Sequence, residues 1–393
     1  MSGKGKYFMA KDVVIFGAGQ IGHLALAKYK DRVDYFIDNN VQMQGKNING
    51  IPVKSVEEGV DNLDGHMIVI ASKYQEMMAK QLRDMEVDKY SFYIEDNDAY
   101  YETEELVINP YQDGGFKDFN ESEWNEFTQK NYAVTLVNDM VQQLQGREVM
   151  FNHVEIETVN RCNGNCSFCP VSKGNDTREY KEMTDELFQD IIGQLAEMNY
   201  SGRLALFSNN EPFLDSRILQ RHKYAREKLP DVRMHLFTNG TLLSIDLFKE
   251  LMSYLDELII DNYQQDLKLI KPCQKIVSYC EEHPELRKKV TIILRKPQEI
   301  LTSRGGDAPN RKKMVSYKKD SCILPYKQLI IRPGGKVSLC CNDPLGKNTL
   351  GDLTQDSILD VWNNQRFKVI REALYKGREN WPHCQYCDAF SLG

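Results

Sequence analysis

Three cysteines close together constrain this chain more than any other feature of its sequence. Cys162, Cys166 and Cys169 stand in the segment RCNGNCSFCP, with the spacing CxxxCxxC. Cysteine thiolates at such short spacings can hold an iron–sulfur cube within one loop. A cube has four irons, so three ligands leave one iron for a distant cysteine or a small molecule. The alternatives are a structural zinc site, which normally closes with four ligands, and three unrelated thiols.

Composition and charge indicate what kind of protein carries these cysteines. The chain has 393 residues, enough for two or three domains, and 10 cysteines. Its formal net charge is −7 with both signs interspersed, so no basic stripe favours a nucleic-acid partner. No apolar run reaches the roughly 18 residues of a membrane span, and the start lacks the apolar core of a signal peptide. We therefore expect a cytoplasmic protein with no membrane partner, whose clustered cysteines bind metal.

The N-terminal part carries a glycine-rich turn between a strand and a helix. KDVVIF predicts a buried strand, GAGQIG follows it, and VDYFID predicts a second strand that ends in an acid. Such glycines let a pyrophosphate approach a helix N-terminus, and the acid can bind ribose hydroxyls. The glycines would also serve plain helix–strand packing. The residues predicted to bind a nucleotide are Gly17, Gly19, Gly22 and Asp38.

From residue 151 the sequence alternates strands and helices, which predicts a parallel sheet or partial barrel. HVEIETV leads into the cysteine loop, and four later strands, RLALFS, RMHLFTNG, ELIIDNY and KVTIILRK, end in or near polar residues. The carboxyl ends of the strands are where βα barrels place their chemistry. Cys273 and Cys280 share one face of a predicted helix between these strands, and we expect them in the core.

Toward the carboxyl end the cysteines become dense again. CILPYKQLIIRPGGKVSLCC predicts a β-hairpin between Cys322 and Cys340, and a helix then leads to HCQYC, with Cys384 and Cys387. Four thiolates would saturate one cube, and a saturated cube can move an electron without binding substrate. Cys341 competes with its neighbour, because adjacent strand residues point to opposite faces. Zinc is again an alternative, since four thiolates with a CxxC pair suit it.

The first cysteine motif, with the aromatic Phe168 before its third cysteine, resembles the signature of the radical S-adenosylmethionine (SAM) enzymes. The resemblance implies a 4Fe-4S cluster whose open iron binds SAM, and cleavage of SAM to a 5′-deoxyadenosyl radical. In that family the second strand ends in GGE, and here NNEP stands in its place. Glu211 matches, whereas Asn209 and Asn210 depart from the glycines. The SAM contacts implied are Phe168, Glu211, Asn239, Asp261 and Arg295.

The carboxyl-terminal hairpin, helix and HCQYC resemble the auxiliary-cluster module of radical SAM enzymes, called SPASM with two clusters and twitch with one. No cysteine follows Cys387, so twitch is the better match. The resemblance implies a second 4Fe-4S cluster, held by Cys322, Cys340, Cys384 and Cys387. In the N-terminal part, FIDNN and GIPV resemble small Rossmann-like domains of polysaccharide-biosynthesis enzymes, which hold a nucleotide or nucleotide-sugar.

The expected fold is α/β, with an N-terminal Rossmann-like parallel sheet, a partial (β/α)6 radical SAM barrel and a C-terminal β-hairpin plus helix. The expected domains are a nucleotide-binding domain over 1–100, a helical connector over 101–150, the radical SAM core over 151–315 and the twitch domain over 316–393. Within the connector, residues 124–145 predict one amphipathic helix.

A twitch domain with one saturated cluster looks like the arrangement in radical SAM dehydrogenases acting on aminocyclitols. The resemblance implies an oxidoreductase that abstracts hydrogen from a sugar, amino sugar or nucleotide-sugar, by dehydrogenation or epimerisation, with the auxiliary cluster as electron relay. Arg304, in LTSRGGDAPN, is the expected catalytic-site contact to substrate, because a guanidinium beside glycines can reach hydroxyls or phosphates. An arginine on a mobile surface loop is the alternative. The expected protein partner is a one-electron reductant of the flavodoxin or ferredoxin type.

Two other functions fit parts of the sequence. A radical SAM peptide or protein maturase would use the same auxiliary module, although GAGQIG stands where a leader-peptide binder would have a helix and wing. A nucleotide-sensing iron–sulfur electron carrier would not be an enzyme and would not cleave SAM. SAM turnover separates that carrier from both enzymes, and a panel of sugars and peptides separates the enzymes from each other.

Overall fold

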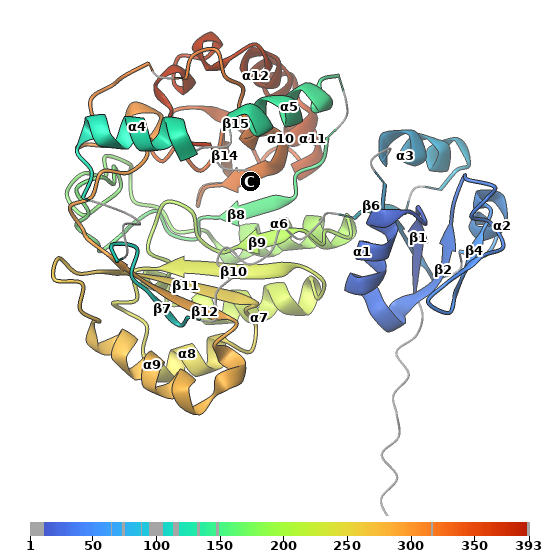
Figure 1. Ribbon diagram of the computed structural model, residues 1–393, viewed down its shortest axis with the longest axis horizontal. Coiled ribbons are helices and arrows are strands. Elements are labelled where there is room, and N and C mark those ends of the chain that lie inside the picture. Colours follow the sequence, from blue (N-terminus) through green and yellow to red (C-terminus); the bar gives the residue numbers. More distant parts are fainter. Residues whose placement is uncertain are drawn as a thin grey trace, which may run out of the picture. The chain divides into compact units, whose positions relative to one another are not determined.

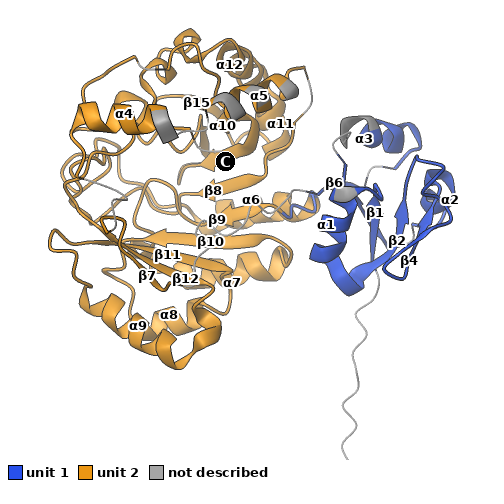
Figure 2. Cartoon of the chain, in the orientation of Figure 1, with its two compact units in different colours: residues 1–97, 198–201 blue, residues 98–197, 202–393 orange. Residues whose placement is uncertain are grey.

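The computed structural model describes residues 12–63, 65–72, 75–87, 89–93, 105–112, 118–131, 134–146, 149–315 and 317–390. The chain divides into two compact units, which Figure 2 shows in different colours. The first comprises residues 1–97 and 198–201, and the second comprises 98–197 and 202–393. None of the helices in the described part of the chain has the length and hydropathy of a membrane span.

The first unit is a six-stranded sheet in the order β3-β4-β2-β1-β5-β6, parallel except for the β3–β4 pair (Figure 1). Successive residues of its central strand face opposite layers. Val13 and Ile15 pack in one apolar cluster, and Val14 and Phe16 pack in another. Both faces are therefore buried, as is usual for parallel sheets. The elements are β1 (Val13–Phe16), α1 (Gln20–Tyr29), β2 (Val33–Ile37), β3 (Asn47–Ile48), β4 (Ile51–Lys54), α2 (Val56–Val60), β5 (Met67–Ile70), α3 (Gln75–Asp84) and β6 (Tyr90–Phe92).

The second unit is built on a nine-stranded sheet in the order β15-β14-β13-β8-β9-β10-β11-β12-β7. All neighbours from β13 to β7 are parallel. Four helices, α6 to α9, connect β8 to β12 as successive crossovers. The strands are β7 (Val107–Ile108), β8 (His153–Ile156), β9 (Arg203–Ala205), β10 (Arg233–Thr238), β11 (Glu257–Tyr263), β12 (Val290–Arg295), β13 (Gln328–Ile331), β14 (Lys336–Ser338) and β15 (Thr349–Asp352). The helices are α4 (Glu121–Asn131), α5 (Val134–Leu144), α6 (Asp185–Glu197), α7 (Ile218–Lys228), α8 (Ile245–Leu251), α9 (Lys271–Glu282), α10 (Leu324–Lys327), α11 (Ile358–Asn363) and α12 (Gln365–Tyr375).

The α/β class predicted from the sequence is confirmed, and the five core strands β8 to β12 occur where the alternating pattern predicts them. The start of α6 shows why the pattern works locally. Thr184 precedes the helix, and its hydroxyl accepts a hydrogen bond from the backbone N–H of Leu187 at 3.2 Å, as an N-cap does. The domain boundaries given above remain predictions.

The sheet extends further than the sequence indicates. The first hairpin strand, β13, pairs in parallel with β8, and Gln328 lies opposite His153. The auxiliary hairpin therefore continues the core sheet and covers the edge of β8, which would otherwise be open. At the other edge β7, which lies within the predicted helical connector, pairs with β12.

One predicted long helix is a pair of shorter ones. In the predicted helix over 124–145, the described residues form α4 up to Asn131 and α5 from Val134, and residues 132–133 lie outside the described chain. The last predicted helix breaks at Asn364, which ends α11 and begins α12. Its side chain accepts the backbone N–H of Phe367 at 3.0 Å, and asparagine favours such capping positions over helix interiors.

Candidate active site

The cysteine loop follows β8, at the carboxyl end of that strand. Cys166 is buried, and Cys162 and Cys169 are half-buried. The backbone N–H of Gly164 points at the sulfur of Cys162, 3.3 Å away. A Cβ at Gly164 would lie 3.3 Å from that sulfur and 3.9 Å from the sulfur of Cys166, so glycine leaves the space between the thiols open. Three thiols around a side-chain-free residue fit the cluster that the sequence motif implies.

Burial sets the protonation of these thiols. It raises the pKa of Cys162 to about 12, and it also raises the pKa of Cys166, where the neighbouring thiols add to the effect. Both groups are therefore neutral at physiological pH in the metal-free protein. Ligation would have to displace their protons, as metal binding to thiols does.

An arginine that the sequence motifs do not mark, with a side chain only 9% exposed, holds the ends of the loop in place. Arg178 donates to both carboxylate oxygens of Glu157, at 2.9 and 3.1 Å, and forms an ion pair with Asp176. The same guanidinium donates to the backbone carbonyl of Asn160 at 3.2 Å and to that of Asn209 at 3.0 Å. Arg178 thus ties the cysteine loop to the NNEP turn after β9.

The carboxylate of Glu211 is 1% exposed and faces the end of β10. It accepts the hydroxyl of Thr238 at 2.7 Å, the backbone N–H of Asn239 at 2.9 Å and that of Phe213 at 3.3 Å. Burial raises the pKa of Glu211 to about 7, against the effect of these hydrogen bonds. The structure therefore places the predicted SAM residue beside the cysteine loop, where it also joins two strand ends.

A cavity of about 320 Å³ lies beside the cysteine loop. Asn239 lines it and donates to the side chain of Asn163 at 2.8 Å. Phe168 is buried and packs against Tyr263, with ring centroids 5.9 Å apart. The residues lining the cavity come from the cysteine loop and from the segments after β10, β11 and β12: Asn163, Gly164, Asn165, Cys166, Asn239, Thr241, Tyr263, Ile270, Pro297 and Gln298.

Two further predicted SAM residues lie on β11 and β12: Asp261 lies two residues before the end of β11, and Arg295 is the last residue of β12. Arg295 forms an ion pair with Glu299 at 2.6 Å, and Glu299 also accepts the hydroxyl of Tyr111 and the backbone N–H of Lys296. Burial raises the pKa of Asp261 to about 6, although the charge of Arg295 opposes the shift. Asp261 is therefore partly protonated near neutral pH.

Arg304 approaches the interior of the second unit from the loop after β12. Within the described residues its guanidinium has no hydrogen-bond or ion-pair partner, and its charge acts on Glu155, Asp261 and Cys341. Glu155, on β8, is 6% exposed and accepts the hydroxyl of Ser208 at 2.6 Å. Burial raises the pKa of Glu155 to about 7. The sequence motifs do not mark this carboxylate, because it sits inside a strand and not at its end.

The four carboxyl-terminal cysteines predicted to share a cluster lie close enough to influence one another. Burial raises the pKa of Cys340, and Cys341, Cys322, Cys384 and Cys387 add to the shift. Burial is also the largest cause of the raised pKa of Cys341, but the second largest cause is the charge of Glu155. The thiol of Cys340 thus lies within electrostatic range of the other cysteines, and the thiol of Cys341 also lies within range of the carboxylate of Glu155.

Among the described residues, no three His, Cys, Asp or Glu side chains converge as the ligands of a single ion do. The thiolates of a cube bind different irons and need no such convergence. Cys273 and Cys280 lie on α9 and are fully buried in the core, away from these groups.

In the first unit, two of the three glycines of the turn are required by packing. A Cβ at Gly17 would lie 2.4 Å from the carbonyl oxygen of Ala71, and one at Gly22 would lie 1.9 Å from that of Gly17. Gly19 has no such neighbour within 4 Å. The carboxylate of Asp38 accepts the backbone N–H of Ala18 at 2.6 Å, so it braces the turn directly.

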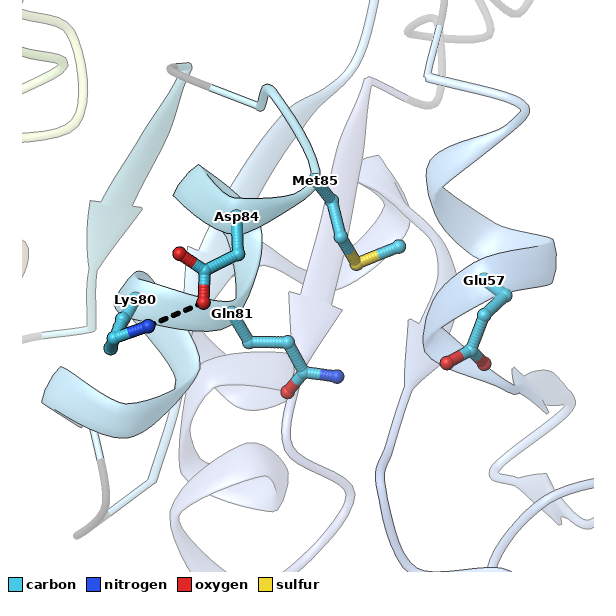
Figure 3. A pocket seen from close by; sticks show the side chains of 5 residues that line it. All are labelled: Glu57, Lys80, Gln81, Asp84 and Met85. Atoms are coloured by element: carbon cyan, nitrogen blue, oxygen red, sulfur yellow. Dashed lines mark hydrogen bonds and ion pairs between the residues drawn. The ribbon is translucent and has the colours of Figure 1, made fainter.

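The first unit also has a hollow between α2 and α3, shown in Figure 3, with a volume of about 510 Å³. Glu57 lines it from α2, and Lys80, Gln81, Asp84 and Met85 line it from the other side. Lys80 and Asp84 form an ion pair at 2.5 Å. The hollow includes neither the glycines of the turn nor Asp38, so it is separate from the predicted nucleotide site.

Two segments of the second unit match known protein families. Residues 156–278 match the radical SAM superfamily, and residues 322–388 match the iron–sulfur cluster-binding domain SPASM. A curated relative is the S-adenosyl-L-methionine-dependent 2-deoxy-scyllo-inosamine dehydrogenase of Niallia circulans. It is 25% identical over 246 residues, which are 62% of this chain and 95% of the relative.

Solved structures similar to this chain include two of BtrN. BtrN in complex with AdoMet and 2-DOIA has a TM-score of 0.54 and 23% identity, over 63% of this chain and 96% of that one. An open conformation of BtrN has a TM-score of 0.47 and 21% identity, over 62% and 94% of the two chains. The first of these likenesses supports the fold of the second unit.

These findings confirm the predicted radical SAM and auxiliary-cluster domains, and they favour an enzyme over the electron carrier. The two domains imply iron–sulfur clusters and SAM as cofactors. The chain thus contains a radical SAM domain followed by an SPASM domain, and its curated relative is an enzyme.

Proposed function

We propose that this enzyme oxidises a secondary alcohol of a small amino sugar or aminocyclitol to a ketone. The observation that carries the proposal is the group formed by Arg304, Glu155 and Asp261, in which a guanidinium without a partner among the described residues lies within electrostatic range of one buried and one half-buried carboxyl group. Guanidinium and carboxylate groups together suit a substrate with hydroxyls and an ammonium group. The similarity to a dehydrogenase of 2-deoxy-scyllo-inosamine supports this substrate class.

The first cofactor site would use the cysteine loop and the cavity beside it. Cys162, Cys166 and Cys169 would hold a 4Fe-4S cluster, which with bound SAM and one electron supplies a 5′-deoxyadenosyl radical. The cavity of about 320 Å³ is placed to receive part of SAM. The side chains proposed to contact SAM remain those predicted from the sequence: Phe168, Glu211, Asn239, Asp261 and Arg295.

Each chain residue has a defined task in the oxidation. Arg304 binds a substrate hydroxyl and orients the carbon that loses its hydrogen atom. Glu155 accepts the hydroxyl proton, since a pKa of about 7 leaves much of it ionised at neutral pH. The substrate loses one hydrogen atom to the radical, one proton to this carboxylate and one electron toward the second cysteine group. Cys322, Cys340, Cys384 and Cys387 would hold the 4Fe-4S cluster that takes the electron, as in a twitch domain.

A second outcome, epimerisation, is favoured by one observation. The thiol of Cys341 is not needed for a four-cysteine cluster, and it lies within range of Glu155 and Arg304. A thiol in that place could return a hydrogen atom to the opposite face of a substrate radical. The carbon would then acquire hydrogen from the solvent, and the thiyl radical would be reduced by one electron and one proton.

The first unit is proposed to bind a nucleotide or nucleotide-sugar. Gly19 precedes α1 with open space around it, and no side chain caps the helix, so its first N–H groups can meet a phosphate. Titration of the protein with UDP-sugars by calorimetry tests this directly. Binding that is lost in Gly19→Ala supports the site, and no binding of any nucleotide contradicts it.

The experiment that tests the enzymatic proposal is a substrate panel. Anaerobically reconstituted protein, SAM and a flavodoxin or dithionite as one-electron reductant are incubated with 2-deoxy-scyllo-inosamine, amino sugars, nucleotide-sugars and peptides. We expect 5′-deoxyadenosine and a product that has lost two hydrogens with the first two classes. An epimer carrying solvent deuterium in D2O identifies the second outcome, and turnover of peptides alone would contradict both.

A further inference from the structure

The turn that carries Arg304 has an unusual backbone. The short 3-10 helix η4 (Arg304–Gly306) begins with a φ of 50° at Arg304, followed by 63° at Gly305 and 87° at Gly306. A positive φ is uncommon for a residue with a side chain and persists only where the surroundings impose it. Something outside the turn must therefore hold Arg304 in this conformation.

The two glycines bring the turn directly against the last cysteine segment. A Cβ at Gly305 would lie 2.1 Å from Nε2 of His383, and one at Gly306 would lie 2.9 Å from Cβ of Tyr386. His383 immediately precedes Cys384, and Tyr386 immediately precedes Cys387. The turn can pack this closely on the auxiliary cysteines only because it has no side chains there.

Hydrogen bonds fix both flanks of the turn to the same segment. Before the turn, the backbone N–H of Ser303 donates to Asp388 at 2.7 Å, and its hydroxyl donates to the carbonyl of Tyr386 at 2.6 Å. After the turn, Arg311 donates to the other carboxylate oxygen of Asp388, also at 2.7 Å. Asp388 is 2% exposed and directly follows Cys387, so a single buried acid anchors both ends.

The other side of the turn faces the interior. There the Arg304 guanidinium acts on Glu155, Asp261 and Cys341, and it has no partner among the described residues. One short turn thus touches the auxiliary cysteine segment on one side and the proposed substrate group on the other.

We propose that this turn couples the auxiliary cluster to the substrate pocket. Cys384 and Cys387 would bind the cluster and so fix segment 383–388, and this segment positions Arg304 to bind a substrate hydroxyl. The inference rests on the substrate role of Arg304 proposed above. Gly305, His383 and Asp388 are positioning residues in this account. The auxiliary cluster then has a task in substrate binding in addition to accepting an electron.

The test, in the reconstituted holoenzyme, introduces a steric clash between the turn and His383 and then removes it with a second substitution. Gly305→Ala places a methyl group on the ring of His383 and should push the turn away, whereas the pair Gly305→Ala with His383→Ala should let it return. Gly65→Ala is the control, because Gly65 has a φ of 79° and an added Cβ there would meet nothing within 4 Å, so it carries the backbone strain without the clash.

Two measurements report on the turn. The first is the KM for 2-deoxy-scyllo-inosamine, which should rise about tenfold in Gly305→Ala, as loss of a charged hydrogen bond would produce, with kcat changed less. The second is the midpoint potential of the auxiliary cluster, from an EPR-monitored redox titration. It should fall as the positive charge moves away, because nearby charge sets cluster potentials. Both values should move back toward the parent in the double variant.

Failure of the coupling and failure of the proposed function give different results. If Arg304→Gln leaves KM unchanged, the substrate role of Arg304 is wrong, and the coupling is then judged by the potential alone. If Gly305→Ala keeps the parent potential while Arg304→Gln lowers it, the coupling is wrong. A double variant that stays as impaired as Gly305→Ala would overturn it as well.

Discussion

The backbone N–H of Asn239 donates to the carboxylate of Glu211 at 2.9 Å, so the end of β10 is tied to the turn that follows β9. Both residues are predicted to contact SAM, and the structure shows that they also hold each other. A cofactor bound at these strand ends would therefore meet a side chain whose position is already fixed, which lowers the entropy lost on binding.

Glu211→Gln keeps the volume of this side chain but removes its charge. We expect SAM to bind about 10- to 100-fold more weakly, the usual range for losing a charged hydrogen bond. The SAM-dependent change in the EPR spectrum of the reduced protein measures the affinity. Glu250→Gln, on the exposed face of α8, is the control and should bind SAM as the parent does. Equal affinity of the two variants would remove Glu211 from the SAM site.

Arg178→Met leaves the buried carboxylate of Glu157 without its ion-pair partner, and it leaves Asp176 with only the longer ion pair to Arg161 at 3.6 Å. Removing one member of a buried ion pair destabilises proteins by about 3–5 kcal/mol. We expect a loss of that size in urea unfolding, together with lower iron loading of the cysteine loop. Lys80→Met is the control, because Lys80 and its partner Asp84 are 69% and 61% exposed and such a surface ion pair should be worth about 1 kcal/mol or less. Similar losses in both variants would contradict the special role of Arg178.

Cys340→Ser and Cys341→Ser separate two neighbouring thiols. The first thiol faces Cys322, Cys384 and Cys387, so we expect its replacement to remove about half of the bound iron, one cube of two. The second variant should keep its iron. Iron and sulfide analysis after reconstitution gives the answer, and loss of iron only in Cys341→Ser would reverse the assignment.

The pH dependence of ketone formation should follow Glu155. Burial raises the pKa of this acid to about 7, and only the ionised form can accept a proton. The ratio of product to 5′-deoxyadenosine should therefore rise as the pH passes through about 7 and level off above it. Glu155→Gln should cleave SAM but form little ketone. A parent profile that stays flat across the pKa of about 7 would show that another group is the base.

Gly22→Ala and Gly19→Ala should differ in stability. A methyl group at Gly22 would meet the carbonyl oxygen of Gly17 at 1.9 Å, whereas Gly19 has open space. We expect the first change to destabilise the N-terminal unit by at least about 2 kcal/mol and the second by about 1 kcal/mol or less. Thermal unfolding measures both, and equal losses would mean that the turn differs from the one described.

The sequence predicts well those features that depend on local spacing. Alternating strands and helices give the core strands β8 to β12, and the position of Glu211 at a strand end places it beside the cysteine loop. Thr184 caps its helix as its position before the acidic first turn indicates. These features need only a residue type at a given distance from an element end.

Features that depend on contacts distant in sequence could not be predicted in this way. The hydrogen bonds of Arg178 to Glu157 and of Glu155 to Ser208 span 21 and 53 residues, and nothing in the local sequence distinguishes Arg178 or Glu155 from other charged residues. The pairing of β13 with β8 joins residues that lie 175 positions apart in the sequence. Gln328 and His153 are one such pair, and their side chains also contact each other. The break between α11 and α12 at Asn364 is different, because a capping residue inside a predicted helix is a local signal that the sequence shows.

The central claim is that two cysteine groups hold two clusters with separate tasks. Iron content and EPR of the anaerobically reconstituted parent and of a Cys162/Cys166/Cys169→Ala variant, each with and without SAM, test it most directly. The account predicts about eight irons in the parent and about four in the variant, with a SAM-dependent spectrum only in the parent. A variant that binds no iron, or binds zinc, would contradict the claim and leave the enzyme without an internal electron acceptor.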